Sequence, residues 1–119
     1  MAITYQSRME GDSLCVVAEG SATSIEEALQ YVESMYRELR RTGLSKLLVY
    51  ETKLHVHMNL DDIADVIRRI NDLRGNSYEH QEAVICSEMV YPLYRHVFEP
   101  VKRIKVFVNE AEAREWLAL

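Results

Sequence analysis

Short apolar runs typical of strands alternate along this chain with longer stretches in which apolar residues recur at helical spacing. Residues 2–8 and 14–19 flank the turn signal Glu10-Gly11-Asp12, a pattern that predicts an antiparallel hairpin. Further strands are predicted over 47–51 and 83–86, whose residues are almost all apolar. Strands of that kind are typically buried on both faces of a sheet.

The helix starts are marked by capping residues. Ser24 and Glu27 form a capping box, and Gly43 closes the helix that follows. The apolar positions of this helix are Ile25, Ala28, Leu29, Val32, Tyr36 and Leu39. Asn59 opens a second helix, and its apolar stripe consists of Leu60, Ile63, Ala64, Ile67 and Ile70.

The C-terminal third predicts two more helices and one more strand. A short aromatic helix is expected from Tyr91 to Phe98, and Pro100 stops it. A strand over 103–108 follows, and Asn109 caps the last helix. The resulting order is β-β-α-β-α-β-α-β-α. It predicts an α/β (mixed α+β) fold, namely a single domain over 1–119 with a five-stranded mixed sheet and right-handed crossovers.

Composition excludes some classes of function. The formal charge of −5 with scattered Lys and Arg disfavours nucleic-acid binding. No apolar stretch approaches the roughly 20 residues of a membrane span, and we expect a cytoplasmic protein. Cys15 and Cys86 lie inside apolar runs, so we expect two buried free thiols, which fit a reducing compartment.

Catalytic and cofactor signatures are weak. His55 and His57 form an H-x-H pair in an extended segment, which could place both rings near one metal ion, with Glu51, Asp61 or Asp62 as further ligands. A zinc site needs three or four ligands, so exposed or half-packed histidines are the favoured interpretation. The sequence contains no glycine-rich phosphate loop and no nucleophile elbow. We therefore expect no cofactor, no metal and no catalytic residue.

An interaction surface is the stronger prediction. The segment from Tyr91 to Phe98 combines aromatic residues with Arg95, and such residues anchor protein interfaces. The alternative is that the tyrosine rings lean on the sheet and expose only their hydroxyls. The predicted interaction surface comprises Glu51, His55, His57, Met58, Asn59, Tyr91, Tyr94, Arg95 and Phe98.

The order of elements and the C-terminal pattern from Val106 to Leu117 (VFVNEAEAREWL) resemble the SpoIIAA-like (STAS-like) family of small bacterial proteins. The resemblance implies a non-enzymatic regulatory domain that binds a protein partner. In that family a phosphorylated Ser starts the helix after a central strand. Here no hydroxyl residue and no Gly occurs between Lys53 and Asp62, so the phosphorylation switch does not carry over.

Other functions stay open at this point. Folds of this architecture include lipid-binding domains, so the alternative is a carrier of a small apolar ligand or lipid with a cleft near residues 89–98. A metal-assisted enzyme built on His55 and His57 is the outsider. A protein partner and self-association into a homodimer are expected, whereas nucleic acid and membrane are not.

Overall fold

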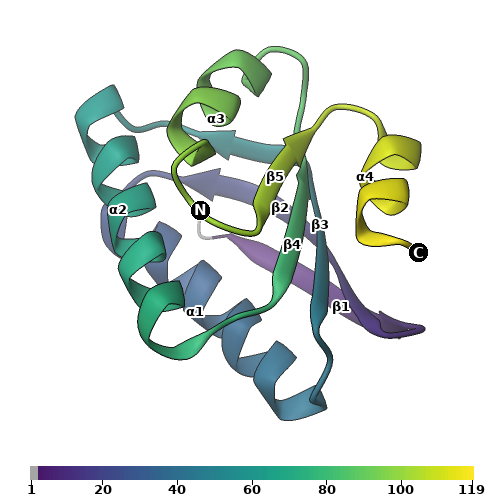
Figure 1. Ribbon diagram of the computed structural model, residues 1–119. Helices are drawn as coiled ribbons and strands as arrows, with labels where there is room; N and C mark the ends of the chain where they lie inside the picture. Colours follow the sequence, from purple (N-terminus) through teal and green to yellow (C-terminus); the bar gives the residue numbers. More distant parts are fainter. Residues whose placement is uncertain (1–2) are drawn as a thin grey trace.

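The computed structural model describes residues 3–119, apart from the side chains of residues 76 and 77. In this part of the chain five strands form one sheet, and four helices pack on it (Figure 1). The elements are β1 (Thr4–Glu10), β2 (Ser13–Ala22), α1 (Ile25–Thr42), β3 (Lys46–Val56), α2 (Leu60–Ser77), β4 (Gln81–Ile85), α3 (Tyr91–Phe98), β5 (Ile104–Phe107) and α4 (Glu110–Leu117).

The sheet follows the chain order β1-β2-β3-β4-β5. β1 and β2 are an antiparallel hairpin, and every other neighbouring pair is parallel. Gly11 takes a positive φ of 62° in the hairpin turn, a backbone conformation that glycine adopts without strain. The mixed five-stranded sheet predicted from the sequence is therefore confirmed.

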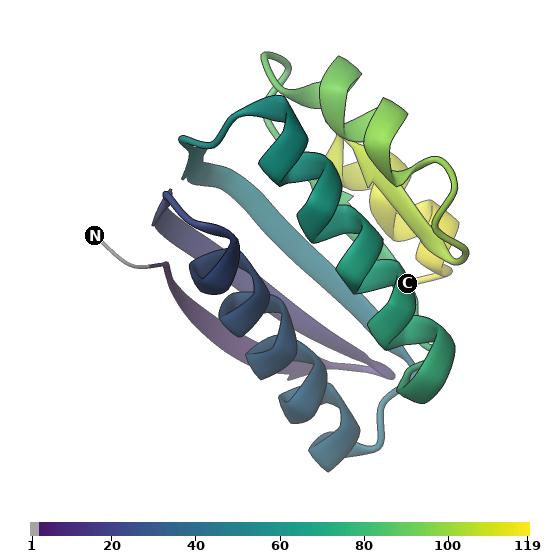
Figure 2. The ribbon, with the colours of Figure 1, turned by 90° about the vertical axis from the view of Figure 1, so that its left-hand side faces the viewer.

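The helices cover the two faces of the sheet unequally. α1 and α2 lie side by side on one face, and α4 lies on the other (Figures 1 and 2). In β3, Leu47 and Val49 belong to the larger core under α1 and α2, whereas Leu48 belongs to the smaller core under α4. All three are fully buried, so the prediction that this strand is covered on both faces is confirmed.

The predicted caps hold the helix starts. Ser24 accepts a hydrogen bond from the Glu27 amide at 3.2 Å, and Asn59 accepts one from the Asp62 amide at 2.8 Å. The capping box differs in one detail, because the Glu27 carboxylate accepts from the Thr23 backbone amide and not from that of Ser24. Each cap satisfies an amide that has no partner within its helix.

The largest difference from a predicted boundary is at the end of β3. The strand expected over 47–51 continues to Val56, so the segment interpreted as a polar turn is mostly strand. The reason lies in β2, which extends to Ala22 and pairs with β3 along its whole length beyond a bulge between Val17 and Glu19. A paired neighbour keeps polar residues extended even where the local apolar run has ended.

Both cysteines are buried and free, as predicted. Burial first, and the nearby Glu51 carboxylate second, raise the pKa of the Cys86 thiol to about 11. The reactive form of cysteine is the thiolate, which such an environment disfavours. Cys86 therefore serves the core as a small apolar side chain.

Candidate functional site

An apolar cavity of about 70 Å³ lies at the end of the sheet where β3 finishes. Its walls come from β2, β3, α1, α2 and α3 together with Ile3 and Met58, so segments far apart in sequence meet there. The lining residues are Ile3, Ala22, Ala28, Tyr31, Val32, Glu51, Leu54, Val56, Met58, Ile63, Val66, Ile67, Ile70, Tyr94, Val97 and Phe98.

Glu51 is the single charged residue of this lining. Its side chain is half-buried, and its Oε2 accepts a hydrogen bond of 2.7 Å from the Tyr31 hydroxyl on α1. Burial raises the pKa of Glu51 to about 7, the Tyr31 hydrogen bond opposes this shift, and the Glu82 carboxylate adds to it. Near neutral pH the protonated and the ionised forms of Glu51 are therefore both populated, although the surrounding wall is apolar.

Helix α3 forms one wall of the cavity and is only partly buried. None of its residues is fully buried, and its first turn has no side-chain cap. Leu93, Val97 and Phe98 contact the larger core, and the rings of Tyr94 and Phe98 lie 5.9 Å apart in an edge-to-face arrangement. Burial raises the pKa of Tyr94 well above its usual value, with a further contribution from Glu51.

The predicted interaction residues separate into two groups. Glu51, Met58, Tyr94 and Phe98 line the cavity, so they face inward at least in part. Met58 follows the carboxyl end of β3, Tyr94 and Phe98 follow that of β4, and Glu51 lies within β3, whose side chains alternate between the two faces of the sheet. Tyr91 and Arg95 instead line a surface hollow beside β5.

His55 lies near the end of β3 and His57 just after it, and both are exposed, with stacked rings whose centroids lie 6.3 Å apart. Their two-residue spacing in extended backbone places both rings on the same side. Among the described residues, no group of three or more His, Cys, Asp or Glu side chains is arranged to hold a metal ion. The pair therefore lacks the further ligands that a zinc site needs.

Two large apolar side chains are exposed at this end of the molecule. Leu60 begins α2 and is 59% exposed, although the sequence pattern put it in the apolar stripe of that helix. Met89 precedes α3 and is 90% exposed. The edge surface is defined here as His55, His57, Asn59, Leu60 and Met89, which lie at or beyond the carboxyl ends of β3 and β4.

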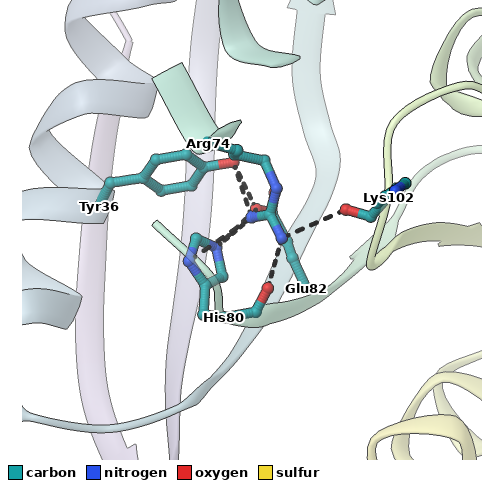
Figure 3. A network of polar contacts seen from close by, with 5 residues as sticks. All are labelled: Tyr36, Arg74, His80, Glu82 and Lys102. Carbon is teal, nitrogen blue, oxygen red and sulfur yellow. Dashed lines mark hydrogen bonds and ion pairs between the residues drawn. The ribbon is translucent and has the colours of Figure 1, made fainter. Parts of the chain in front are cut away.

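A second polar cluster is buried at the opposite end of the strands (Figure 3). Arg74 donates to Glu82 at 3.3 Å and to the carbonyl oxygens of His80 and Lys102, and its Nη1 lies 2.7 Å from His80 Nε2. The Tyr36 hydroxyl donates to Glu82 at 2.6 Å. Burial first, and Glu82 second, raise the pKa of Tyr36.

This buried cluster has a structural role. Arg74, His80 and Glu82 are each at most 6% exposed, and their polar groups bond to one another. The cluster ties the ends of α1 and α2 to the start of β4. The sequence did not predict this cluster, because the spacing of its residues matches no motif.

Comparison with solved structures identifies the architecture. A protein from Shewanella loihica with a SpoIIAA-like fold matches with a TM-score of 0.59 and 19% identity, over 98% of this chain and 94% of that one. The chain has a SpoIIAA-like fold. An anti-sigma factor antagonist from Mycobacterium paratuberculosis gives a TM-score of 0.64 at 11% identity, over 99% of this chain and 96% of that one.

The anti-sigma factor antagonist SpoIIAA in its unphosphorylated form gives a TM-score of 0.55 at 13% identity, over 97% of this chain and 98% of that one. These identities are low, so the likeness concerns the fold. No protein-family model matches the sequence, and no curated protein is similar to it in sequence. Within the described residues, no helix is long and apolar enough to cross a membrane.

Proposed function

We propose that this protein is a non-enzymatic regulatory domain that binds another protein through the edge surface. The observation that carries the proposal is the exposure of Leu60 and Met89 at the same end of the sheet. Large apolar side chains gain free energy when a partner removes them from water, by roughly 1.5–3 kcal/mol each when fully buried. Polar His55, His57 and Asn59 beside them suit the rim of an interface.

The fold supports a binding role. Two of the similar structures are anti-sigma factor antagonists, proteins whose name describes action on another protein. The proposed partner of this chain is accordingly a protein, and self-association is part of the proposal. A cytoplasmic location also belongs to it, since two buried free thiols suit a reducing compartment.

Regulation in this proposal does not use a phosphorylated Ser at the start of α2. That position holds Asn59, whose side chain already accepts the Asp62 amide. Asp61 and Asp62 in the first turn supply the negative charge that the helix N-terminus favours. A phosphate there would add roughly two further negative charges next to these carboxylates.

The test compares variants in affinity capture from the native host. Leu60→Asp and Met89→Asp together should reduce capture of the specific partner at least tenfold, because each places a charge in the buried interface. Met9→Asp is the matched control. Met9 is 68% exposed on the edge strand β1, outside the edge surface, and its substitution should leave capture unchanged.

The proposal fails if the double variant captures every partner as well as the unaltered protein does. It also fails if Met9→Asp has the same effect as the double variant, because the loss would then reflect surface charge in general. Light scattering at micromolar concentration tests the self-association. A mass equal to one chain removes the homodimer and leaves the protein partner to be tested by capture.

A further inference from the structure

The described residues that line the apolar cavity include one carboxyl group and no Lys, Arg or His. Glu51 is the charged lining residue, and the titratable groups coupled to it are Tyr31 on α1, Tyr94 on α3, Cys86 after β4 and, from the buried cluster at the opposite end of the strands, Glu82, which is paired with Arg74. Each of these is neutral or negative. Among the described residues, no Lys, Arg or His forms an ion pair with Glu51.

One carboxyl oxygen of Glu51 accepts a hydrogen bond within the protein, and the other can accept one from a ligand. Oε2 accepts from the Tyr31 hydroxyl, whereas no described residue donates to Oε1. The side chain is half-buried, so Oε1 has access to whatever enters the cavity. An acceptor without a matching donor in an apolar wall favours a ligand that supplies N–H groups and positive charge.

We propose that this cavity binds a small primary alkylamine, whose ammonium group pairs with Glu51 and whose short unbranched chain lies among the apolar side chains. The ligand is complementary to the cavity in both charge and polarity. The rings of Tyr31, Tyr94 and Phe98 line the same cavity, and aromatic faces attract cations. This inference is independent of the proposed protein interaction and concerns the isolated chain.

Size and charge limit the ligand further. The volume of about 70 Å³ is about half of the roughly 150 Å³ of an engineered cavity that holds benzene, so only part of a short alkyl chain lies inside the cavity and the rest lies toward its open side. A carboxylate or phosphate head group would place a second negative charge beside Glu51. The lipid alternative from the sequence is thereby narrowed to a cationic amphiphile of small size.

The pH dependence of binding follows from the same pairing. Glu51 must lose its proton to pair with an ammonium group, and this happens as the pH rises through about 7. Alkylamines stay protonated over this range, since a lysine-like amine titrates near pH 10. Amine affinity should therefore increase severalfold between pH 6 and pH 8, and binding should release a proton near pH 7.

The experiment is a methyl NMR titration of the whole chain, followed on Ile63, Ile67 and Val97, which line the cavity. The probes are n-butylamine, 1-butanol and butanoate at pH 8, which share a chain length and differ in head group. Butylamine should bind at least tenfold more tightly than butanol, and butanoate should not bind. Glu51→Gln should remove the preference for the amine and retain butanol binding.

Glu110→Gln is the matched control, because Glu110 starts α4 on the other face of the sheet and its substitution should leave the amine preference intact. The proposal is overturned if butanoate binds as tightly as butylamine, if no probe shifts the three methyl signals, or if Glu51→Gln keeps the preference. A backbone amide spectrum of each variant confirms that its fold is retained before the titration is interpreted.

Discussion

Replacement of Glu51 by Gln should stabilise the protein at pH 8 and have little effect at pH 5. The variant keeps the shape of the side chain and an oxygen that can accept from Tyr31, but it carries no charge. In the folded protein the pKa of Glu51 is raised from its usual 4.5 to about 7, so the native state holds a proton that the unfolded chain has lost. Stability therefore falls as the pH rises from 4.5 to 7, and the full loss is present above pH 7.

The size of this effect follows from the shift in pKa. Each pKa unit corresponds to about 1.4 kcal/mol, which gives an upper limit of about 3 kcal/mol for Glu51. Because the side chain is half-buried and partly screened by water, we expect a gain of about 1–3 kcal/mol for Glu51→Gln at pH 8. At pH 5 the two proteins should differ by less than about 1 kcal/mol.

The assay is urea denaturation of both proteins at pH 5 and pH 8, at constant ionic strength, with the midpoint and slope fitted separately. Glu110→Gln serves as the control, because its expected change in stability at pH 8 has the opposite sign. Hydrogen bonds from Arg114 and Tyr50 lower the pKa of Glu110, so removal of its charge should destabilise the protein at pH 8. If the difference between Glu51→Gln and the unaltered protein is the same at both pH values, the carboxylate is solvated and the reasoning about the cavity is wrong.

Three further predictions concern other parts of the chain. Arg74→Met should destabilise the protein by about 3–5 kcal/mol in urea denaturation, because it leaves the Glu82 carboxylate buried without its cation; a loss below about 1 kcal/mol would show that water reaches the cluster. Asn59→Ala should lower the free energy of unfolding by about 1 kcal/mol through loss of the helix cap, and Asn59→Ser should restore most of it. Alanine at both His55 and His57 should change stability by less than about 0.5 kcal/mol in the same assay, and a larger loss would indicate that the rings are structural.

Much of the fold followed from local patterns in the sequence. The capping residues Ser24, Asn59 and Asn109 marked helix starts correctly, because a cap acts within one turn of its own helix. The end of β3 was misjudged because its last residues are extended by pairing with β2. Strand pairing joins residues more than 30 positions apart, and no local pattern contains that information.

Only part of the candidate site could be predicted from the sequence. The sequence assigned Glu51 and the segment around Tyr94 to one interaction surface, and the cavity brings both together. The sequence suggested an exposed interaction surface for these residues, however, and gave no sign that they line an apolar cavity. Leu60 shows the reverse, since its helical spacing suggested burial and its place at the first turn of α2 leaves it exposed.

By itself the sequence determined the order of the elements and the starts of the helices, because these depend on residues close together in the chain, and the alternation of strands and helices implied the mixed sheet. Tertiary structure alone decided the environment of Glu51, whose hydrogen bond to Tyr31 spans 20 positions, and the buried contact of Tyr36 with Glu82, which spans 46. Burial and the loss of water that shift a pKa arise only when α1, α2 and α3 pack against the sheet. The pKa of Glu51 and the buried contact of Tyr36 with Glu82 therefore depend on contacts between elements.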